Sequence, residues 1–329
     1  MIQDNVDEAS RLLACKHMIK QRHKIEAGQK LVPSNENHSQ QAELCAIDKS
    51  NVSIACTIRC YASHQSLNSN DILAARLRTP ACIILDIEGT TTSLRFIKDT
   101  LFPYIRRNIY RYLKERWNTE EVQVTLARLY RQEDRDRNDG FAPPKLVRDI
   151  NADPDRAINS LVSNVLWQMD NKRHNTALKQ LQILVWVYGY ESGELKGHVY
   201  DDVGYAFRRW RSMGIRLFVY STGMAVAQQL LFSNSTQGNL LNLIENYFDL
   251  LIGPKTSSSS FKKLSHQYIM IPPRDILFIS DSHDEARAAR EAGCQAILIQ
   301  RPENKPLSAI AAQEFPIVSS LSQIEFSAG

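Results

Sequence analysis

Residues 83–92 read Ile-Ile-Leu-Asp-Ile-Glu-Gly-Thr-Thr-Thr, a short apolar run that ends in two carboxylates, a glycine and three hydroxyls. Strands of a parallel sheet are buried on both faces and read as such continuous apolar runs. The carboxyl end of this strand brings Asp86 to the edge of the sheet, where α/β proteins bind their ligands. Asp86 and Glu88 are alternate residues of an extended chain, so their side chains point to the same side and can divide nucleophilic attack and proton transfer.

The turn that follows this strand is the second feature of the run. Gly89 allows the chain to leave the strand sharply, and the hydroxyls of Thr90–Thr92 are able to hold an anion. A strand end with an ordinary polar turn would give the same pattern, so the run by itself leaves both interpretations open.

Three more apolar runs end in polar side chains that can bind phosphate. They are residues 215–220, followed by Ser221 and Thr222; residues 247–253, followed after one proline by Lys255; and residues 276–280, followed by Asp281. Hydroxyls and free backbone N–H groups at a strand-to-helix junction suit phosphate oxygens, and a lysine supplies a compact positive charge. Because carboxyl ends of parallel strands meet at one edge of a sheet, the four segments predict one shared site.

An aspartate nucleophile, a hydroxyl, a lysine and a late aspartate in this order resemble the haloacid dehalogenase phosphatases. Residues 86–104, DIEGTTTSLRFIKDTLFPY, are similar to the opening of the enolase-phosphatase E1 family of methionine salvage, which has Glu where most of the superfamily has Asp, as at Glu88. Further similar segments are residues 164–169, 176–182, 193–197, 228–232 and 235–238. The resemblance covers roughly residues 81–320.

The resemblance implies a covalent mechanism. Asp86 would attack phosphorus and form an aspartyl-phosphate, which divides a difficult hydrolysis into two easier steps. Glu88 would protonate the leaving oxygen and then activate water. Ser221, Thr222 and Lys255 would bind the substrate through its phosphoryl oxygens. Lys255 would also be a catalytic residue.

The resemblance also implies Mg²⁺ as the cofactor and a specific substrate. Asp86, Asp281 and the backbone carbonyl of Glu88 would bind the ion, since Mg²⁺ prefers oxygen ligands. Glu285, one turn after Asp281, either orients these ligands or is a surface carboxylate. The substrate would be 2,3-diketo-5-methylthiopentyl-1-phosphate, which the family enolises and then dephosphorylates to the acireductone 1,2-dihydroxy-3-keto-5-methylthiopentene. Glu88 is the simplest candidate for the enolisation base.

Two alternatives remain open. Ile183 stands where the family usually has glycine, which favours a haloacid dehalogenase phosphatase for another small phosphate ester. A non-catalytic binding module is the second alternative, but Asp86 and Asp281 are both present.

The order of the segments predicts the fold class and three parts. Strands alternating with helices indicate a mainly parallel, doubly wound, Rossmann-like α/β sheet of the haloacid dehalogenase kind. This core takes residues 79–102 and 206–329, and a helical cap over residues 103–205 is inserted after the first strand. Residues 1–78 mix Ser, Asn, Gln and charge, and we expect a disordered leader with a helix over residues 9–24.

The leader also carries one alternative of its own. Cys56, Cys60 and His64 could form part of a zinc site, although their spacing is not that of a standard finger.

Composition indicates which partners and which cellular compartment to expect. The net charge of +4 in 329 residues is too small to indicate nucleic-acid or membrane partners. Six scattered cysteines fit thiols in a reducing compartment rather than a disulfide framework. We expect a monomeric cytoplasmic enzyme that binds a small phosphorylated substrate, with the nucleus left open as a second location.

Overall fold

The structure is a computed structural model that describes residues 77–149 and 153–327. Its centre is a parallel sheet of six strands in the order β4-β3-β2-β5-β6-β7. The strands are β2 (Cys82–Leu85), β3 (Arg216–Tyr220), β4 (Asn246–Phe248), β5 (Ile276–Ser280), β6 (Gln295–Ile299) and β7 (Ile317–Val318). The predicted parallel sheet is confirmed, and the strand that carries Asp86 lies near its middle.

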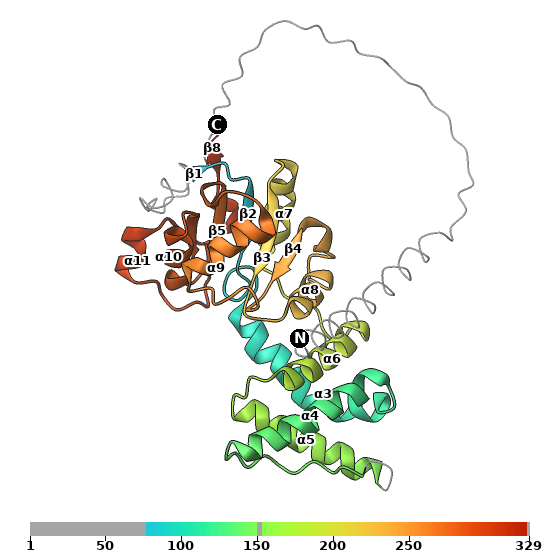
Figure 1. Ribbon diagram of the computed structural model, residues 1–329. Helices are drawn as coiled ribbons and strands as arrows, with labels where there is room; N and C mark the ends of the chain where they lie inside the picture. The colour runs from blue at the N-terminus through green and yellow to red at the C-terminus, as the bar shows by residue number, and fades with distance from the viewer. Residues whose placement is uncertain (1–76, 150–152, 328–329) are drawn as a thin grey trace, which may run out of the picture. The chain divides into compact units, whose positions relative to one another are not determined.

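Alternate side chains of the strands pack into two separate hydrophobic cores, one on each face of the sheet. In β2, Ile83 and Leu85 belong to one core, and Cys82 and Ile84 to the other. Helices α7 (Asp201–Ser212) and α8 (Ala225–Ser233) cover the first face, and α9 (Ser258–Lys263), α10 (His283–Glu291) and α11 (Ala309–Glu314) the second (Figure 1). Burial on both faces explains why the strands read as continuous apolar runs.

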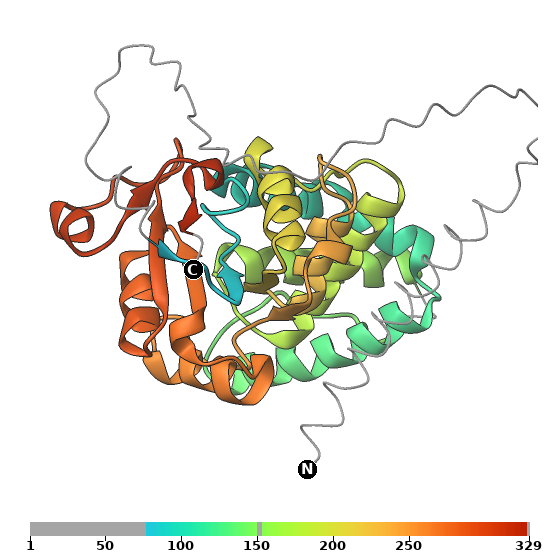
Figure 2. The same ribbon diagram turned by 90° about the horizontal axis from the view of Figure 1, so that it is seen from above.

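A group of helices follows β2 and occupies the segment predicted as a cap. It consists of a six-residue π-helix, η1 (Phe96–Leu101), and of α3 (Phe102–Arg116), α4 (Glu120–Asn138), α5 (Pro154–Asp170) and α6 (Thr176–Glu191). The side chains of Asp153 and Asn175 cap α5 and α6 by accepting backbone N–H groups. Figure 1 shows these helices below the sheet, so in Figure 2, which is seen from above, they lie behind it in teal to yellow-green. The chain returns from them into α7. The helical segment thus begins a few residues before position 103.

The remaining elements are short. Two-residue strands β1 (Leu77–Arg78) and β8 (Phe326–Ser327) pair in parallel, so the segment predicted as a leader contributes its last two residues to a small second sheet. The other short helices are η2 (Leu241–Leu243), η3 (Leu264–Ile269), η4 (Pro273–Asp275) and η5 (Leu321–Gln323).

Several sequence predictions fall outside the described ranges. The predicted helix over residues 9–24 and the alternative zinc site at Cys56, Cys60 and His64 are among them. Within the described ranges, Cys82 and Cys294 are buried free thiols. No helix in those ranges combines the length and apolar character needed to cross a membrane.

Candidate active site

The turn after β2 is held by hydrogen bonds within its own backbone. The carbonyl of Ile87 accepts the N–H groups of Thr90, Thr91 and Thr92 at 2.9–3.1 Å, and the N–H of Gly89 donates to the carbonyl of Thr92 at 2.8 Å. Gly89 has a φ of +72°, which L side chains rarely adopt. This tight turn ends the strand abruptly and leaves the buried Asp86 at the carboxyl edge of the sheet.

The three threonine hydroxyls serve the turn and do not face an open site. All three residues are fully buried. The Thr90 hydroxyl donates to Oδ2 of Asp86 at 3.4 Å, the Thr91 hydroxyl to the Asp86 carbonyl at 3.2 Å, and the Thr92 hydroxyl to the His198 carbonyl at 2.5 Å. The prediction that these hydroxyls hold an anion is therefore wrong, because internal acceptors already occupy them.

Lys255 is brought directly to the predicted nucleophile. Its Nζ lies 2.5 Å from Oδ1 of Asp86 and 2.9 Å from Oε2 of Glu285, and its side chain is only 6% exposed. Burial alone would lower the pKa of the Lys255 ammonium, but the carboxylates of Asp86 and Glu285 outweigh it and hold that pKa above its ordinary value. The lysine is thus a fixed positive charge beside Asp86.

The strand before Lys255 is shorter than predicted. It ends at Phe248 because Asp249 turns the chain: its side chain accepts the N–H groups of Leu251 and Ala225 at 3.0 and 3.2 Å. The N–H of Ile252 also donates to the Asp249 carbonyl at 3.1 Å. Residues 249–254 therefore form a loop that carries Lys255 from the outer strand β4 back to Asp86.

Glu285 points into the site from the first turn of α10. Besides Lys255, its Oε2 accepts the hydroxyl of Ser280, the last residue of β5, at 2.8 Å. The interpretation of Glu285 as a surface carboxylate is therefore wrong for this chain. It fixes the position of the lysine, a role that its i+4 spacing from Asp281 could have suggested.

Ser221 and Thr222 differ in their surroundings. Ser221 is buried at the end of β3, where its N–H donates to the Phe248 carbonyl at 3.1 Å and its hydroxyl accepts the N–H of Gly223 at 3.4 Å. Thr222 is exposed. Gln228 was not among the predicted site residues. Its buried side chain donates to the carbonyls of Gly223 and Phe248 at 2.7 and 2.8 Å and so holds this loop in place.

Asp281 follows β5 and lies beside the turn that carries Gly89. In the sheet register Leu85 is opposite Ile279, and the N–H of Asp86 donates to the Ile279 carbonyl at 3.0 Å. Burial, followed by the charges of Asp86 and Glu285, raises the pKa of the Asp281 carboxyl to about 7. Burial and the charge of Asp86 likewise raise the pKa of Glu88. Four carboxyl groups thus gather near the ammonium of Lys255.

The donor set fits a hard divalent cation. No group of three or more His, Cys, Asp or Glu side chains in the described ranges has the arrangement of a metal site. The predicted set differs in kind, since it combines the carboxylates of Asp86 and Asp281 with the backbone carbonyl of Glu88. The neighbouring carbonyls of Ile87 and Gly89 accept hydrogen bonds, whereas no hydrogen bond from the described residues reaches that of Glu88. Excess negative charge and a free carbonyl oxygen suit Mg²⁺.

Replacing Gly89 by alanine is expected to abolish phosphate release. An added Cβ would collide with Oδ2 of Asp281, lie 3.0 Å from Oδ1 of Asn304 and strain a residue with positive φ. Gly214 is a matched control: its φ is +79°, it lies just before β3 at the opposite edge of the sheet, and nothing lies within 4 Å of its added Cβ.

Gly214→Ala should therefore lower the free energy of unfolding by about 1 kcal/mol and keep full turnover. Phosphate release and thermal midpoints of both variants check this expectation. Equal activity in Gly89→Ala and Gly214→Ala would contradict the close approach of Asp281 to this turn.

Comparison with known proteins shows the family of this chain. Residues 80–293 match the haloacid dehalogenase-like hydrolase family. The chain is 43% identical over 246 residues to enolase-phosphatase E1 of Xenopus tropicalis, which covers 74% of this chain and 94% of the relative. It is 40% identical over 259 residues to the Anopheles gambiae enolase-phosphatase E1, covering 78% and 86%.

A solved structure shares the fold. The crystal structure of the UTR4 protein from Saccharomyces cerevisiae superposes with a TM-score of 0.60 at 27% identity and covers 73% of this chain and 98% of the yeast chain. The sequence matches, which extend over most of each relative, and the family match over residues 80–293 lead to one conclusion. The chain belongs to the enolase-phosphatase E1 family of haloacid dehalogenase-like hydrolases.

Proposed function

We propose that this chain converts 2,3-diketo-5-methylthiopentyl-1-phosphate to the acireductone 1,2-dihydroxy-3-keto-5-methylthiopentene and phosphate. The observation that carries the proposal is the contact of 2.5 Å between Nζ of Lys255 and Oδ1 of Asp86, at the carboxyl edge of the sheet in a chain of the enolase-phosphatase E1 family. A buried carboxylate beside a fixed ammonium is suited to attack a phosphate ester.

Phosphate transfer would proceed through Asp86. A carboxylate oxygen of Asp86 forms a bond to phosphorus while the bond from phosphorus to the ester oxygen breaks. Glu88 gives a proton to the departing oxygen, later takes one from water, and the resulting hydroxide releases phosphate from the aspartyl-phosphate. Lys255 and the hydroxyl of Ser221 stabilise the negative charge on the phosphoryl oxygens, and Thr222 offers a further hydroxyl.

Asp86, Asp281 and the backbone carbonyl of Glu88 would hold Mg²⁺. When bound, the ion offsets the repulsion between the phosphate and the carboxylates and stabilises negative charge on substrate oxygens. Lys255 faces Asp86 and Glu285. The contact of Lys255 with Asp86 supports a site in which the lysine and the proposed metal ligands share one nucleophile.

Glu88 is the proposed base for the enolisation that precedes phosphate release. It would remove a proton from the carbon next to a ketone. The electron pair of that C–H bond would form the new carbon–carbon double bond, and the π pair of the carbonyl would move onto its oxygen, which takes a proton from solvent to give the enol. Glu88 lies two residues after Asp86 and is partly exposed, so the same carboxylate can serve both steps.

One assay tests the reaction. The purified chain receives the diketone phosphate with Mg²⁺, and enol absorbance and phosphate release are followed separately, with p-nitrophenyl phosphate as a small comparison substrate. Both signals should appear with the diketone phosphate, with enol formation first. Phosphate release from p-nitrophenyl phosphate alone would favour the alternative of a haloacid dehalogenase phosphatase for another ester. That alternative rests on Ile183, which is buried in helix α6.

The division into a leader, a core and a cap is part of the proposal. Deleting residues 1–76 should leave kcat and the thermal midpoint close to the full-length values, because all catalytic groups follow Cys82 and the leader offers little apolar surface. Deleting residues 1–78 also removes β1 and the ion pair of Arg78 with Asp275, and should lower the midpoint by no more than about 2–4 °C without a change in kcat.

Activity and melting of the two truncated proteins and of the full chain decide this point. Loss of most activity after removal of residues 1–76 would mean that the leader is needed by the catalytic domain.

We also propose a monomer located in the cytoplasm, with the nucleus as an alternative, that binds neither nucleic acid nor membrane. The small net charge and the scattered cysteines support this assignment. Light scattering on the purified chain should give the mass of one copy.

A further inference from the structure

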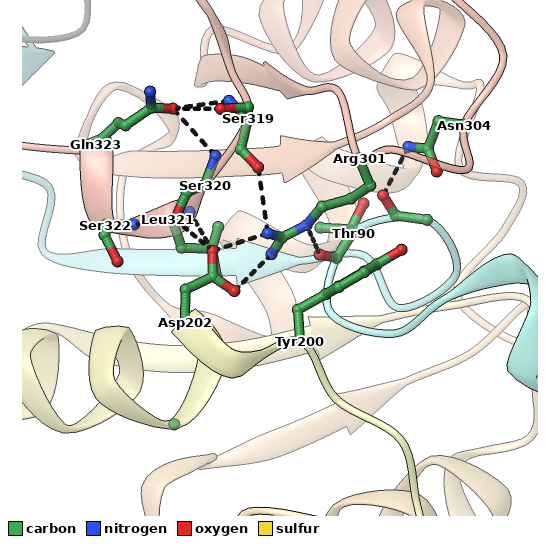
Figure 3. Close-up of polar contacts among 12 residues, drawn as sticks. Thr90, Tyr200, Asp202, Arg301, Asn304, Ser319, Ser320, Leu321, Ser322 and Gln323 are labelled. Atoms are coloured by element: carbon green, nitrogen blue, oxygen red, sulfur yellow. Dashed lines mark hydrogen bonds and ion pairs between the residues drawn. The ribbon is translucent and has the colours of Figure 1, made fainter. Parts of the chain in front are cut away.

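A buried arginine lies between the turn of the nucleophile and the point where the chain returns from the cap. Arg301 follows β6 and is 4% exposed. Its Nε donates to the Thr90 carbonyl at 3.0 Å, and its two terminal nitrogens lie 2.8 and 3.0 Å from the two carboxylate oxygens of Asp202. Its guanidinium also lies 4.1 Å from the centre of the Tyr200 ring (Figure 3).

These contacts join segments that are far apart in the sequence. Thr90 belongs to the turn after Asp86, whereas Tyr200 and Asp202 mark the entry from the cap into helix α7. Asp202 also accepts the hydroxyl of Ser320 and the N–H of Leu321, both at 2.7 Å (Figure 3). Burial would raise the pKa of the Asp202 carboxyl, but these hydrogen bonds and the charge of Arg301 together hold the pKa below its ordinary value. The carboxylate of Asp202 is thus held in place and in turn fixes the position of the Arg301 guanidinium.

The turn after Asp86 is held from outside at three successive carbonyls. Asn304 donates its Nδ2 to the Gly89 carbonyl at 2.8 Å, Arg301 donates to that of Thr90, and the backbone N–H of Tyr200 donates to that of Thr91 at 3.1 Å. The same turn carries Asp86 at its start. An arginine fork is suited to this role because its donors have fixed relative directions.

We propose that Arg301 is a positioning residue. It fixes the conformation of the turn that follows Asp86 and connects this turn to Tyr200 and Asp202, where the chain returns from the cap. Asn304 supports the same turn. Arg301 itself touches neither Asp86 nor Lys255 in the contacts described above. It acts through the carbonyl of Thr90 and through Asp202 and Tyr200. This inference rests on the proposed function, since it concerns the same phosphate transfer.

The variants Arg301→Met and Arg301→Lys test the inference. Arg301→Met removes both the hydrogen bond to Thr90 and the ion pair with Asp202, so kcat for the diketone phosphate should fall by about tenfold to a hundredfold, more than any rise in KM. Arg301→Lys keeps a charge for Asp202 but not the forked donors. Compared with Arg301→Met, this variant should regain most of the lost thermal midpoint but little of the lost kcat.

Arg290 provides the matched control. Its guanidinium bonds the carbonyl and the carboxylate of Glu314, both at 2.9 Å, and lies 4.2 Å from the Phe315 ring, away from the site. Arg290→Met and Arg290→Lys should keep wild-type kcat. Asn304→Ala, which frees the Gly89 carbonyl, should lower kcat with a smaller change in midpoint than Arg301→Met.

The outcomes separate this inference from the proposed function. A wild-type chain that releases no phosphate would contradict the proposed function itself. An active wild type together with an Arg301→Met variant whose kcat is within twofold would overturn only the positioning role. Recovery of kcat in parallel with thermal stability in Arg301→Lys would also overturn it, because a purely structural role predicts that parallel.

Discussion

Asp86→Asn is expected to lower phosphate release by at least about 10³-fold while the fold is retained, because an amide oxygen cannot form the aspartyl-phosphate. Asparagine is nearly isosteric with aspartate, and its Oδ1 can still accept the hydrogen bond that Nζ of Lys255 now donates to Asp86 at 2.5 Å. The measurement is phosphate release from the diketone phosphate under single-turnover conditions. Circular dichroism of the same preparation reports whether the fold is intact.

A surface carboxylate serves as the control for this variant. Asp170 ends cap helix α5 and pairs with Arg106, and both side chains are well exposed. An exposed ion pair contributes little to stability, so Asp170→Asn should match the wild type in both rate and melting. Phosphate release by homogeneous Asp86→Asn at near wild-type rate would remove Asp86 from the role of nucleophile.

Removal of Mg²⁺ is expected to abolish turnover, and its return to restore turnover fully. The reason is the excess of carboxylates around Lys255: burial and the neighbouring charges of Asp86 and Glu285 raise the pKa of Asp281. A divalent cation bound by oxygen ligands would relieve this repulsion. EDTA titration of phosphate release, followed by addition of Mg²⁺ or Zn²⁺, checks the expectation.

A second readout does not depend on activity. A ligand that binds the native state raises the thermal midpoint, so Mg²⁺ should stabilise the wild type in the absence of substrate. Asp281→Asn should lose this Mg²⁺-dependent rise, whereas Asp170→Asn should keep it. Full turnover in metal-free buffer, or a strict preference for Zn²⁺, would contradict the all-oxygen ligand set.

Much of the fold could be predicted because its strands are buried on both faces. Such strands are marked by apolar runs that need no distant information to be recognised, as residues 83–85 and 276–280 illustrate. The run over residues 247–253 was predicted too long, because the side chain of Asp249 turns the chain after Phe248. Apolar character alone does not distinguish a short edge strand from an apolar loop.

The sequence predicted which strand ends form the candidate site, but not how every side chain in it is oriented. Parallel strands deliver their carboxyl ends to one edge, so the proximity of Asp86, Lys255 and Asp281 followed from the order of the segments. The orientation of Glu285 did not, because a helix residue near a strand end can face either solvent or the sheet. The burial of Gln228 against the loop of Ser221 was missed for the same reason.

The sequence by itself thus determined the parallel sheet, the place of the helical insertion and the carboxyl edge where the polar residues gather. These depend on local periodicity, which sets the faces that each segment must bury. Only the tertiary structure decided which polar groups satisfy one another. The hydroxyls of Thr90–Thr92 turned inward, and the carbonyl of Thr90 found its donor in Arg301, 211 residues away. A buried polar group needs a partner, but packing of distant segments chooses that partner.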